Sequence, residues 1–135
     1  SEAVGLTITP CIERVKRLER EHFILGYYAR LNPAMLGASL LVFVEISLGS
    51  KSGNMFEQFR REVLRIPEVL ECHLLSGGYD YLLRFITRGV NHYQEVIEGL
   101  LERNIGIAKY FSYIVIKSPF IKTHCPIERL FPNQR

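Results

Sequence analysis

Apolar residues recur along the chain with two periods, which divide most of it into strands and helices. An apolar run rich in β-branched residues over Leu40–Leu48 predicts a buried strand. Residues 69–75, 79–87 and 108–117 have the same character and predict three further strands. The glycine- and serine-rich residues 49–53 predict a loop after the first strand.

Two other stretches place apolar residues three or four positions apart, which is the spacing of an amphipathic helix. Asn54 and Asn91 begin these stretches and are followed three residues later by Glu57 and Gln94, so both are predicted N-caps. Pro67 ends the first helix, and the second ends near residues 104–106. The predicted inner faces are Phe56, Phe59, Val63 and Ile66, and then Tyr93, Val96, Ile97, Leu100 and Leu101.

The order strand, helix, strand, strand, helix, strand predicts an α+β fold. This is the ferredoxin-like βαββαβ arrangement, with both helices on one face of an antiparallel sheet. The first and last predicted strands carry apolar side chains on both of their faces. In the first strand, Leu40, Val42, Val44 and Ile46 alternate with Leu41 and Phe43, and in the last, Tyr110, Ile114 and Ile116 alternate with Phe111, Tyr113 and Val115. The uncovered face predicts a symmetric homodimer that packs sheet against sheet, as a dimeric αβ sandwich.

A further helix is predicted near the N-terminus, over residues 10–21. Thr9 suits the N-cap and Pro10 the first helical position, where its missing N–H costs nothing. One side would carry Cys11, Ile12, Val15 and Leu18, and the other Glu13, Lys16, Arg17 and Arg20. Acids nearly offset bases here, so charge alone predicts an amphipathic surface helix rather than one that binds DNA.

Composition limits the class of protein. The 135 residues are 47% hydrophobic, enough for one well-packed domain with an appendage, and the net charge of +3 indicates no particular anionic partner. No apolar run is long enough to span a bilayer and no signal peptide is recognisable, which predicts a cytoplasmic protein without a membrane partner. Cys11, Cys72 and Cys125 have no metal-like spacing, so reduced thiols, no metal and no cofactor are predicted.

Catalytic motifs are absent from the sequence. It contains no P-loop, nucleophile elbow, HExxH motif or dinucleotide-binding glycine pattern. His73 and His92 are isolated and are interpreted as surface or half-buried histidines, and the spacing of Glu71 and Asp80 commits them to no common site. The prediction is that the protein is not an enzyme and has no catalytic residues.

One short segment, Ser-Gly-Gly-Tyr-Asp-Tyr at residues 76–81, allows two interpretations. It can be a hairpin turn whose glycines adopt positive φ and whose tyrosines pack. Alternatively, its glycines expose backbone N–H groups suited to a carboxylate, while Asp80 offers a counter-charge for an ammonium group. A free amino acid carries both of these groups.

The N-terminal third carries a longer pattern: Ala-Val-Gly-Leu-Thr-Ile-Thr-Pro-Cys at residues 3–11, Arg-Val-Lys-Arg-Leu-Glu at 14–19, and Phe-Ile-x-Gly-Tyr-x-Ala-x-Leu-Asn at 23–32. It resembles the leucine-responsive/asparagine-regulator (Lrp/AsnC) family of bacterial and archaeal transcription regulators. The resemblance implies that residues 1–33 are a partial winged helix-turn-helix and linker strand, without the first helix and most of the second. Gly5 would form the turn, and His22 stands where the family usually has a helix-ending Gly.

The resemblance also implies roles for the rest of the chain. Residues 38–117 would form the effector and dimerisation domain, and residues 118–135 a C-terminal arm. Dimers would assemble into rings such as octamers. The recognition helix would meet DNA through Thr7, Thr9, Glu13, Arg14 and Arg17.

The family carries a Gly-x-Tyr/Phe-Asp-Tyr-like loop at residues 77–81 and binds amino acids where dimers meet. The implied effector-binding residues are Gly77, Gly78, Tyr79, Asp80 and Tyr81. Gly78 replaces an Asp that is frequent in leucine-responsive members, which weakens the case for leucine itself. The implied function is a DNA-binding transcription regulator in which an amino acid or related small molecule sets the oligomeric state and thereby operator affinity.

Three alternatives do not involve DNA. A ferredoxin-like dimer can be a small enzyme, such as a cofactor-free oxygenase, or an ACT-like sensor attached to metabolic enzymes. It can also be an interaction module that modulates a full-length relative. An enclosed pocket between helix and sheet, lined by His and Asn, would favour an enzyme, whereas a groove between dimers beside Asp80 would favour a regulator.

Overall fold

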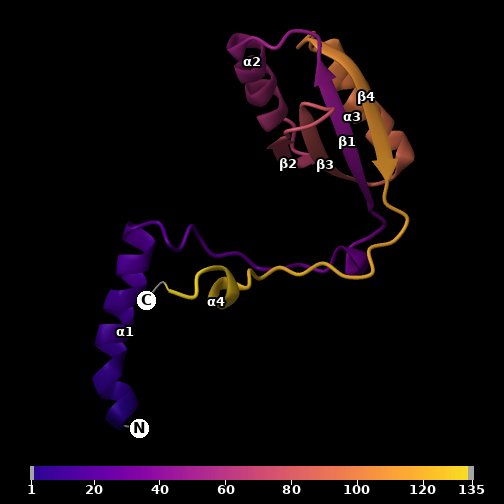
Figure 1. The fold of residues 1–135 in the computed structure, drawn as a ribbon. Coiled ribbons are helices and arrows are strands. Elements are labelled where there is room, and N and C mark those ends of the chain that lie inside the picture. Colours follow the sequence, from indigo (N-terminus) through magenta and orange to yellow (C-terminus); the bar gives the residue numbers. More distant parts are fainter. Residues whose placement is uncertain (1, 134–135) are drawn as a thin grey trace. The chain divides into compact units, whose positions relative to one another are not determined.

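The computed structural model describes the backbone of residues 2–133 and the side chains of residues 8–133. The chain divides into two compact units, residues 1–32 and residues 33–135. The elements in chain order are α1 (Glu2–Arg20), the 3-10 turn η1 (Pro33–Met35), β1 (Leu40–Leu48), α2 (Gly53–Leu64), β2 (Val69–Leu74), β3 (Tyr81–Thr87), α3 (Val90–Glu102), β4 (Ile107–Ile114) and α4 (Ile127–Leu130) (Figure 1).

The four strands form one antiparallel sheet in the spatial order β2-β3-β1-β4. β1 is a central strand, with β3 on one side from Leu40↔Thr87 to Ile46↔Tyr81 and β4 on the other. A register shift between Ser47 and Leu48 accompanies the end of the β1–β4 pairing. With α2 and α3 inserted in this order, the arrangement is ferredoxin-like, and the predicted α+β fold class is confirmed.

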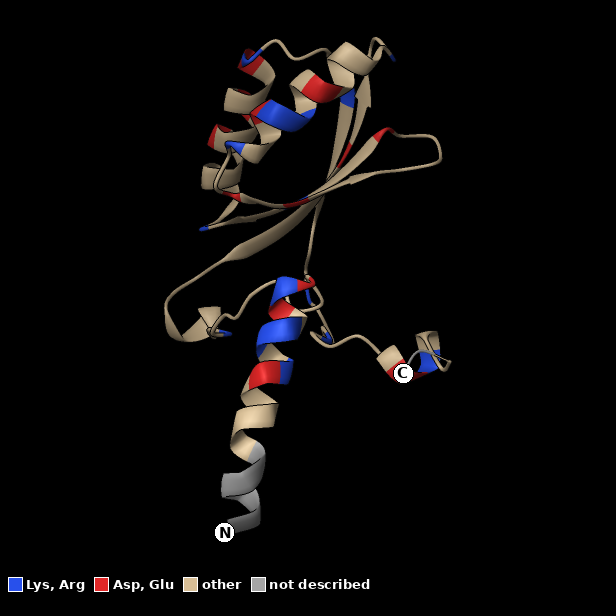
Figure 2. Cartoon of the chain, turned by 90° about the vertical axis from the view of Figure 1, so that its left-hand side faces the viewer, with Lys and Arg blue, Asp and Glu red and all other residues tan. Residues whose placement is uncertain are grey.

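The core lies between the sheet and the two helices α2 and α3. Along β1, Val42, Val44 and Ile46 are fully buried, and the intervening residues face the opposite side of the sheet. The helices contribute Phe59, Val63, Tyr93, Ile97 and Leu100 to the same cluster, so both cover one face (Figure 2). The second face is left without a covering layer by the described residues of this unit.

Both helix N-caps differ from the predicted ones. α2 begins at Gly53, and the Ser52 hydroxyl accepts a hydrogen bond from the Met55 N–H at 3.3 Å, which replaces Asn54 as the cap. Ser and Asn are equally good caps, so a cap two residues earlier satisfies the same N–H groups. α3 begins after Gly89 with no side-chain cap, and Asn91 lies inside it. There the His92 ring accepts the Arg88 N–H at 3.0 Å instead.

The loop between β2 and β3 is longer than a tight hairpin. β2 ends at Leu74 and β3 begins at Tyr81, and the loop is closed by the Leu75 N–H, which donates to the Asp80 carbonyl at 2.9 Å. Gly77 and Gly78 do not adopt positive φ, contrary to the hairpin interpretation. A six-residue connection turns the chain gradually and does not need the left-handed residues of a two-residue turn.

Positive φ is required instead at the corner between α3 and β4. Asn104 has φ +54° and Gly106 has φ +80°. The Gly106 carbonyl accepts the Gly49 N–H at 2.8 Å, and an added Cβ at Gly106 would collide with the terminal methyl of Met55. This corner therefore holds the β1–α2 loop against the end of α3, and Gly is favoured there by its positive φ, whereas the flexible end of Met55 can move aside.

In the N-terminal unit, α1 is a single helix, which corrects two expectations. Gly5 lies inside α1 instead of turning the chain, and Thr9 and Pro10 lie in its interior instead of at its start. Gly also adopts helical dihedral angles, and Pro10 removes one backbone hydrogen bond without ending the helix. A turn at Gly5 needs packing from a neighbouring helix, and the described residues up to 32 contain no second helix. The expected helix-turn-helix is therefore not formed in this structure.

The C-terminus of α1 has a Schellman motif centred on His22, which has φ +62°. The Phe23 N–H donates to the Leu18 carbonyl at 2.8 Å, and the His22 N–H donates to the Glu19 carbonyl at 3.1 Å. His22 thus occupies the left-handed position that Gly usually takes. The predicted position of the helix end is correct to within one residue.

The segments that flank the sheet differ from expectation. Residues 25–32 carry no strand, because a strand exists only when it is hydrogen-bonded to a neighbour. In the C-terminal arm, residues Ile127–Leu130 form the short helix α4, which the sequence patterns did not predict. Large apolar side chains are exposed in and next to both segments: Phe23, Leu25, Tyr27, Tyr28 and Leu31, and Ile116, Phe120, Ile121, Ile127, Leu130 and Phe131.

Candidate functional site

Asp80 is held from several directions at the end of the β2–β3 loop. Its Oδ2 accepts the Leu48 backbone N–H at 2.7 Å and pairs with the Lys51 ammonium. Its own N–H donates to the Ile46 carbonyl at 2.9 Å, so the residue is fixed at backbone and side chain. The Lys51 ammonium, followed by the Leu48 N–H, lowers the pKa of the Asp80 carboxyl below its ordinary value. An ionised carboxylate is therefore presented in a fixed orientation.

Gly77 and Gly78 lie beside Asp80 with open space around them. Both are exposed, and an added Cβ at either position would meet no atom within 4 Å. Since neither has positive φ, the backbone of the isolated chain does not require Gly at these two positions. What the two glycines provide is an unshielded backbone that another molecule can approach closely.

The two tyrosines of the segment have different surroundings. The Tyr79 ring meets Phe111 edge-on, with ring centroids 5.7 Å apart, and the Lys109 ammonium lies 5.6 Å from the Tyr79 centroid. The Tyr81 ring is buried and stacks on Phe59 at 4.4 Å. Burial raises the pKa of the Tyr81 hydroxyl. Tyr81 thus anchors the segment in the core, whereas Gly77, Gly78, Tyr79 and Asp80 form its accessible part.

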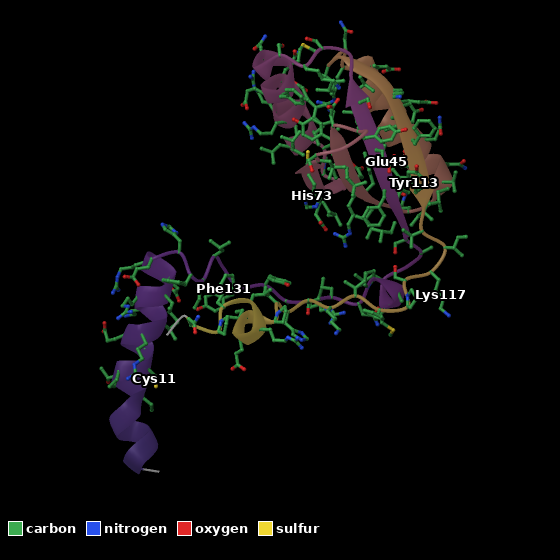
Figure 3. The ribbon with its side chains drawn as sticks, in the orientation of Figure 1. Cys11, Glu45, His73, Tyr113, Lys117 and Phe131 are labelled. Carbon is green, nitrogen blue, oxygen red and sulfur yellow. The ribbon has the colours of Figure 1, made fainter. Side chains whose placement is uncertain are left out.

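The helix-free face of the sheet is a second candidate surface. Strand register places the following residues on it: Leu41, Phe43, Glu45, Leu82, Arg84, Ile86, Phe111 and Tyr113. The Tyr113 hydroxyl donates to Glu45 Oε2 at 3.3 Å, across the β1–β4 pair (Figure 3). Phe111 and Tyr113 are each about half exposed, at 49% and 51%. The face is therefore a mostly apolar surface with a polar bridge near its centre.

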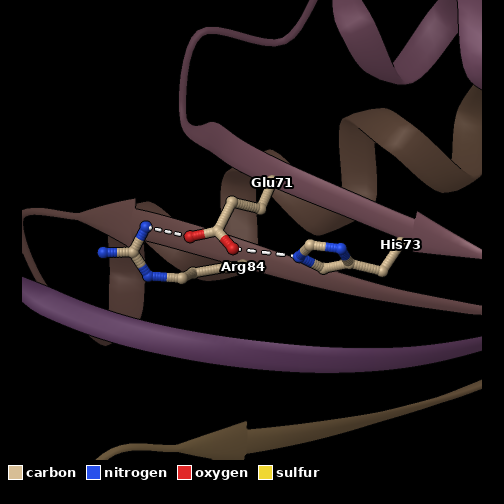
Figure 4. Close-up of polar contacts among 3 residues, drawn as sticks. All are labelled: Glu71, His73 and Arg84. Atoms are coloured by element: carbon tan, nitrogen blue, oxygen red, sulfur yellow. Dashed lines mark hydrogen bonds and ion pairs between the residues drawn. The ribbon is translucent and has the colours of Figure 1, made fainter. Parts of the chain in front are cut away.

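A three-residue polar cluster lies on the same face at the β2 edge (Figure 4). Glu71 Oε2 accepts from Arg84 at 2.5 Å, and Glu71 Oε1 lies 2.9 Å from His73 Nε2. The hydrogen bond with His73, followed by the charge of Arg84, lowers the pKa of the Glu71 carboxyl. Since the cluster is at least partly exposed and its charges pair internally, its structure fits a polar rim around the apolar surface.

The polar side of α1 carries the residues expected to contact DNA. Thr9, Glu13 and Arg17 follow one another at four-residue intervals, and with Arg14 they are exposed. The Thr7 side chain lies outside the described residues. Acidic and basic residues are interspersed along the helix (Figure 2). Ile8, Ile12 and Val15 form the apolar side and are also exposed, at 41–48%.

The remaining polar side chains among residues 8–133 do not assemble a catalytic site. His92 accepts the Arg88 N–H at Nδ1, so its Nε2 carries the proton and donates to Glu68 at 3.0 Å. This is a half-buried structural histidine, as predicted, and His73 is exposed. Two adjoining cavities between α2 and β2 are lined by neither His nor Asn: one by Arg60, Val63, Leu64, Val69, Leu70, Glu71 and Cys72, and the other by Gly53, Phe56, Glu57, Arg60, Cys72, Leu74 and Tyr81.

Among the described residues, no group of three or more His, Cys, Asp or Glu side chains is arranged to hold a metal ion. No helix in this part of the chain is long and apolar enough to cross a membrane. Cys11, Cys72 and Cys125 are free thiols.

Comparison with known proteins identifies the family. The profile of the Lrp/AsnC ligand binding domain matches residues 41–124, which include all of the sheet except Leu40 and also the Asp80 loop. The chain belongs to the Lrp/AsnC family. Leucine-responsive regulatory proteins of Escherichia coli K12 and Salmonella typhimurium are each 47% identical to it over 117 residues, which is 87% of this chain and 71% of theirs.

Solved Lrp/AsnC structures have the same fold. An AsnC family transcriptional regulator from Agrobacterium tumefaciens is 29% identical and covers 96% of this chain and 84% of its own, with a TM-score of 0.84. A transcriptional regulator of Neisseria meningitidis, solved as an L-methionine complex, is 30% identical and covers 90% of this chain and 78% of its own, with a TM-score of 0.80. The chain is accordingly a transcription regulator and not an enzyme.

The sequence of this Lrp/AsnC domain indicates the Asp80 loop as a candidate site but does not indicate the groups that contact Asp80. Lys51 lies 29 residues before Asp80, in a loop whose composition indicates only a connection between elements. The Leu48 N–H is also remote in sequence, at 32 residues. The only available signal was the position of Lys51 at the end of a strand central to the predicted sheet, which does not specify the loop it meets.

Proposed function

We propose that this Lrp/AsnC regulator binds a free amino acid at the Asp80 loop. The ammonium group would pair with the Asp80 carboxylate, and the amino-acid carboxylate would accept hydrogen bonds from the exposed backbone at Gly77 and Gly78. Tyr79 would border the ligand, and Tyr81 would hold the segment from the core. The observation that carries this proposal is the fixed, ionised Asp80 beside two glycines whose backbone does not itself need Gly.

The meningococcal relative supports the chemical class of the ligand, since it was solved with L-methionine. Methionine also suits the surroundings as a test ligand, because apolar side chains are close to the loop. Phe56, Leu74 and Tyr81 line a cavity between α2 and β2. The proposed ligand is therefore an amino acid with an apolar side chain, with L-methionine as the first candidate.

The proposed site has a direct calorimetric test. Each of the twenty amino acids is titrated into the wild-type chain and into Asp80→Asn, which keeps the shape and removes the charge. A hydrogen bond to a charged group contributes about 1.5–3 kcal/mol, so binding should weaken at least about tenfold in Asp80→Asn. Glu71→Gln is the matched control, because it removes an ion-paired acid from the β2 edge and should bind like wild type. Absence of heat for every amino acid would contradict the proposal.

Assembly follows from the helix-free face, which we propose packs against the same face of a second copy. The apolar surface of Phe43, Phe111 and Tyr113 would be buried, and Glu71, His73 and Arg84 would form its rim. Light scattering of Phe111→Glu should give a lower molar mass than wild type, because a buried unpaired charge is costly. Leu64→Glu, at a 75% exposed position on α2, is the control and should leave the mass unchanged. Equal masses for wild type and Phe111→Glu would contradict this interface.

DNA contact is proposed for the polar side of α1, through Thr7, Thr9, Glu13, Arg14 and Arg17. With a single helix and interspersed charges, binding should be weak, strongly salt-dependent and poor in sequence preference. Arg14→Ala with Arg17→Ala should reduce the salt slope in a gel-shift series, since about one counterion is released per phosphate contact. Arg65→Ala in the other unit is the control. Tight, sequence-specific binding by this chain would contradict the expected weak contact.

Regulation is proposed to act by linkage between the effector site and assembly. An effector that binds one assembly state more tightly shifts the population towards that state and changes the spacing of DNA-binding units. Rings of dimers such as octamers are the expected larger state. Sedimentation with and without L-methionine measures the shift, and identical profiles at saturating methionine would contradict linkage.

A further inference from the structure

Lys51 occupies the proposed effector position with the same chemical group that an amino acid would bring. Its ammonium pairs with Asp80 Oδ2, the oxygen that also accepts the Leu48 N–H. A primary ammonium on a side chain and the α-ammonium of an amino acid present the same charge and the same three donors. The two groups therefore compete for one carboxylate.

The two partners of this pair differ in how firmly they are held. Asp80 is fixed at its N–H, its carbonyl and its side chain, and its side chain is only 17% exposed. The Lys51 side chain is 60% exposed and lies in the Gly-Ser-Lys-Ser-Gly loop at residues 49–53. Among the described residues, the Lys51 ammonium contacts no other polar group than the Asp80 carboxylate. The carboxylate is therefore preorganised, and the ammonium is free to leave.

Displacement of Lys51 requires little rearrangement of the backbone. The loop is anchored at its start by the Gly49 N–H on the Gly106 carbonyl, and at its end by the Ser52 cap of α2. Neither anchor involves the Lys51 side chain. The long flexible stem can therefore turn into solvent while both anchors stay in place.

From this geometry we infer that Lys51 is a tethered competitor of the effector: its ammonium occupies Asp80 in the free protein and leaves when an amino acid binds. The inference rests on the proposed function of the Asp80 loop. It adds a regulatory element that sets the sensing threshold, since effector affinity is reduced by the fraction of sites that Lys51 occupies. A site with an occupied carboxylate responds only to amino-acid concentrations high enough to displace the tether.

The effect on affinity follows from the strength of an exposed ion pair. Such a pair contributes up to about 1 kcal/mol, which corresponds to about a fivefold reduction in effector affinity. Lys51→Met removes the charge and keeps the length of the side chain. It should tighten L-methionine binding about fivefold, while Lys51→Arg should bind much like wild type.

Calorimetry with two probes separates competition from other roles of Lys51. L-methionine is compared with 4-(methylthio)butanoate, which lacks the ammonium group and cannot contend for Asp80. Lys51→Met should tighten binding of L-methionine and leave that of the deaminated analogue unchanged. If Lys51 instead held the carboxylate of the ligand, Lys51→Met would weaken binding of both probes, and this result would overturn the inference.

The two possible failures are distinguishable. If wild type and Lys51→Met both give no heat with any amino acid, the proposed effector site and the inference both fail. If wild type binds L-methionine and Lys51→Met binds it no more tightly, the effector site stands and the inference alone is overturned. Binding by Lys51→Met where wild type shows none supports the inference. Amide spectra of Lys51→Met that match wild type outside residues 48–53 and 75–81 confirm that the variant folds normally.

Discussion

The two units of this chain differ in how completely they bury their own apolar side chains. In the unit from residue 33 onward, fourteen hydrophobic residues form a buried cluster, and both α2 and α3 face it. In the N-terminal unit, the apolar side of α1 is exposed at Ile8, Ile12 and Val15. The ligand-binding domain thus contains the interactions that determine its fold, whereas the described part of α1 leaves most of its apolar side exposed and depends largely on local hydrogen bonds.

The largest expected difference between the units comes from matched Phe→Ala substitutions. Phe59 is fully buried and stacks on Tyr81, so Phe59→Ala should cost about 3–5 kcal/mol of unfolding free energy. Phe23 is 75% exposed, and Phe23→Ala should change the unfolding free energy by less than about 0.5 kcal/mol. Urea titration followed by circular dichroism measures both. A large cost for Phe23→Ala would show that the N-terminal unit is packed after all.

A smaller effect is expected at the corner that joins α3 to β4. Gly106→Ala places a side chain at positive φ and against Met55, so it should cost about 1–2 kcal/mol. Gly99→Ala is the matched control, because Gly99 lies within α3 with open space around it. It should stabilise the domain by about 0.4–1 kcal/mol. The same urea titration measures the change in unfolding free energy for both variants, and the two changes should have opposite signs. Changes of the same sign would contradict the described corner.

In the N-terminal unit, a substitution at the end of α1 should be stabilising. His22→Gly relieves a left-handed backbone conformation that disfavours a residue with a side chain, and it should strengthen the helix end by up to about 1 kcal/mol. Hydrogen exchange at the Phe23 amide, which donates to Leu18, reports this locally. Slower exchange in His22→Gly is expected. Faster exchange would indicate that the Schellman motif does not limit the stability of α1.

The smallest effect concerns acid stability of the domain. The pKa of Asp80 is lowered in the folded chain, so its contribution is fully present above the unfolded-state value. That contribution is lost as pH falls through the still lower folded-state pKa. Unfolding midpoints between pH 5 and pH 2.5 should therefore fall more steeply in wild type than in Asp80→Asn. Lys51→Met should fall less steeply than wild type, since Lys51 is the largest cause of the shift, and parallel curves would contradict this assignment.

The fold of the domain could be predicted from sequence because each of its apolar periodicities fits only one type of element. The run Leu40–Leu48 alternates between the core and the opposite face, and the observed strand has those bounds. The helix N-caps were harder to predict, because Ser52 and Asn54 are both suitable N-cap residues for α2. Only the packing of α2 decides between them. The turn expected at Gly5 depends on a neighbouring helix, so local sequence could not determine it.

Only half of the candidate site could be predicted from the sequence, for a similar reason. Asp80 and its glycines are contiguous and were recognisable as a group. The Lys51 and Leu48 contacts cross the sheet, and the register that brings them to Asp80 arises only when β1 and β3 pair. Tyr81 was assigned to the site with its neighbours, although strand alternation turns its ring into the core.

The most direct test of the central claim is an amide chemical-shift map of the full chain during titration with L-methionine. If the amino acid binds where its ammonium meets Asp80, the largest shifts will cluster at Gly77, Gly78, Asp80 and Leu48, and Asp80→Asn will need at least about tenfold more L-methionine to reach them. Shifts confined to the cavity between α2 and β2, or shifts that persist unchanged in Asp80→Asn, would contradict the claim.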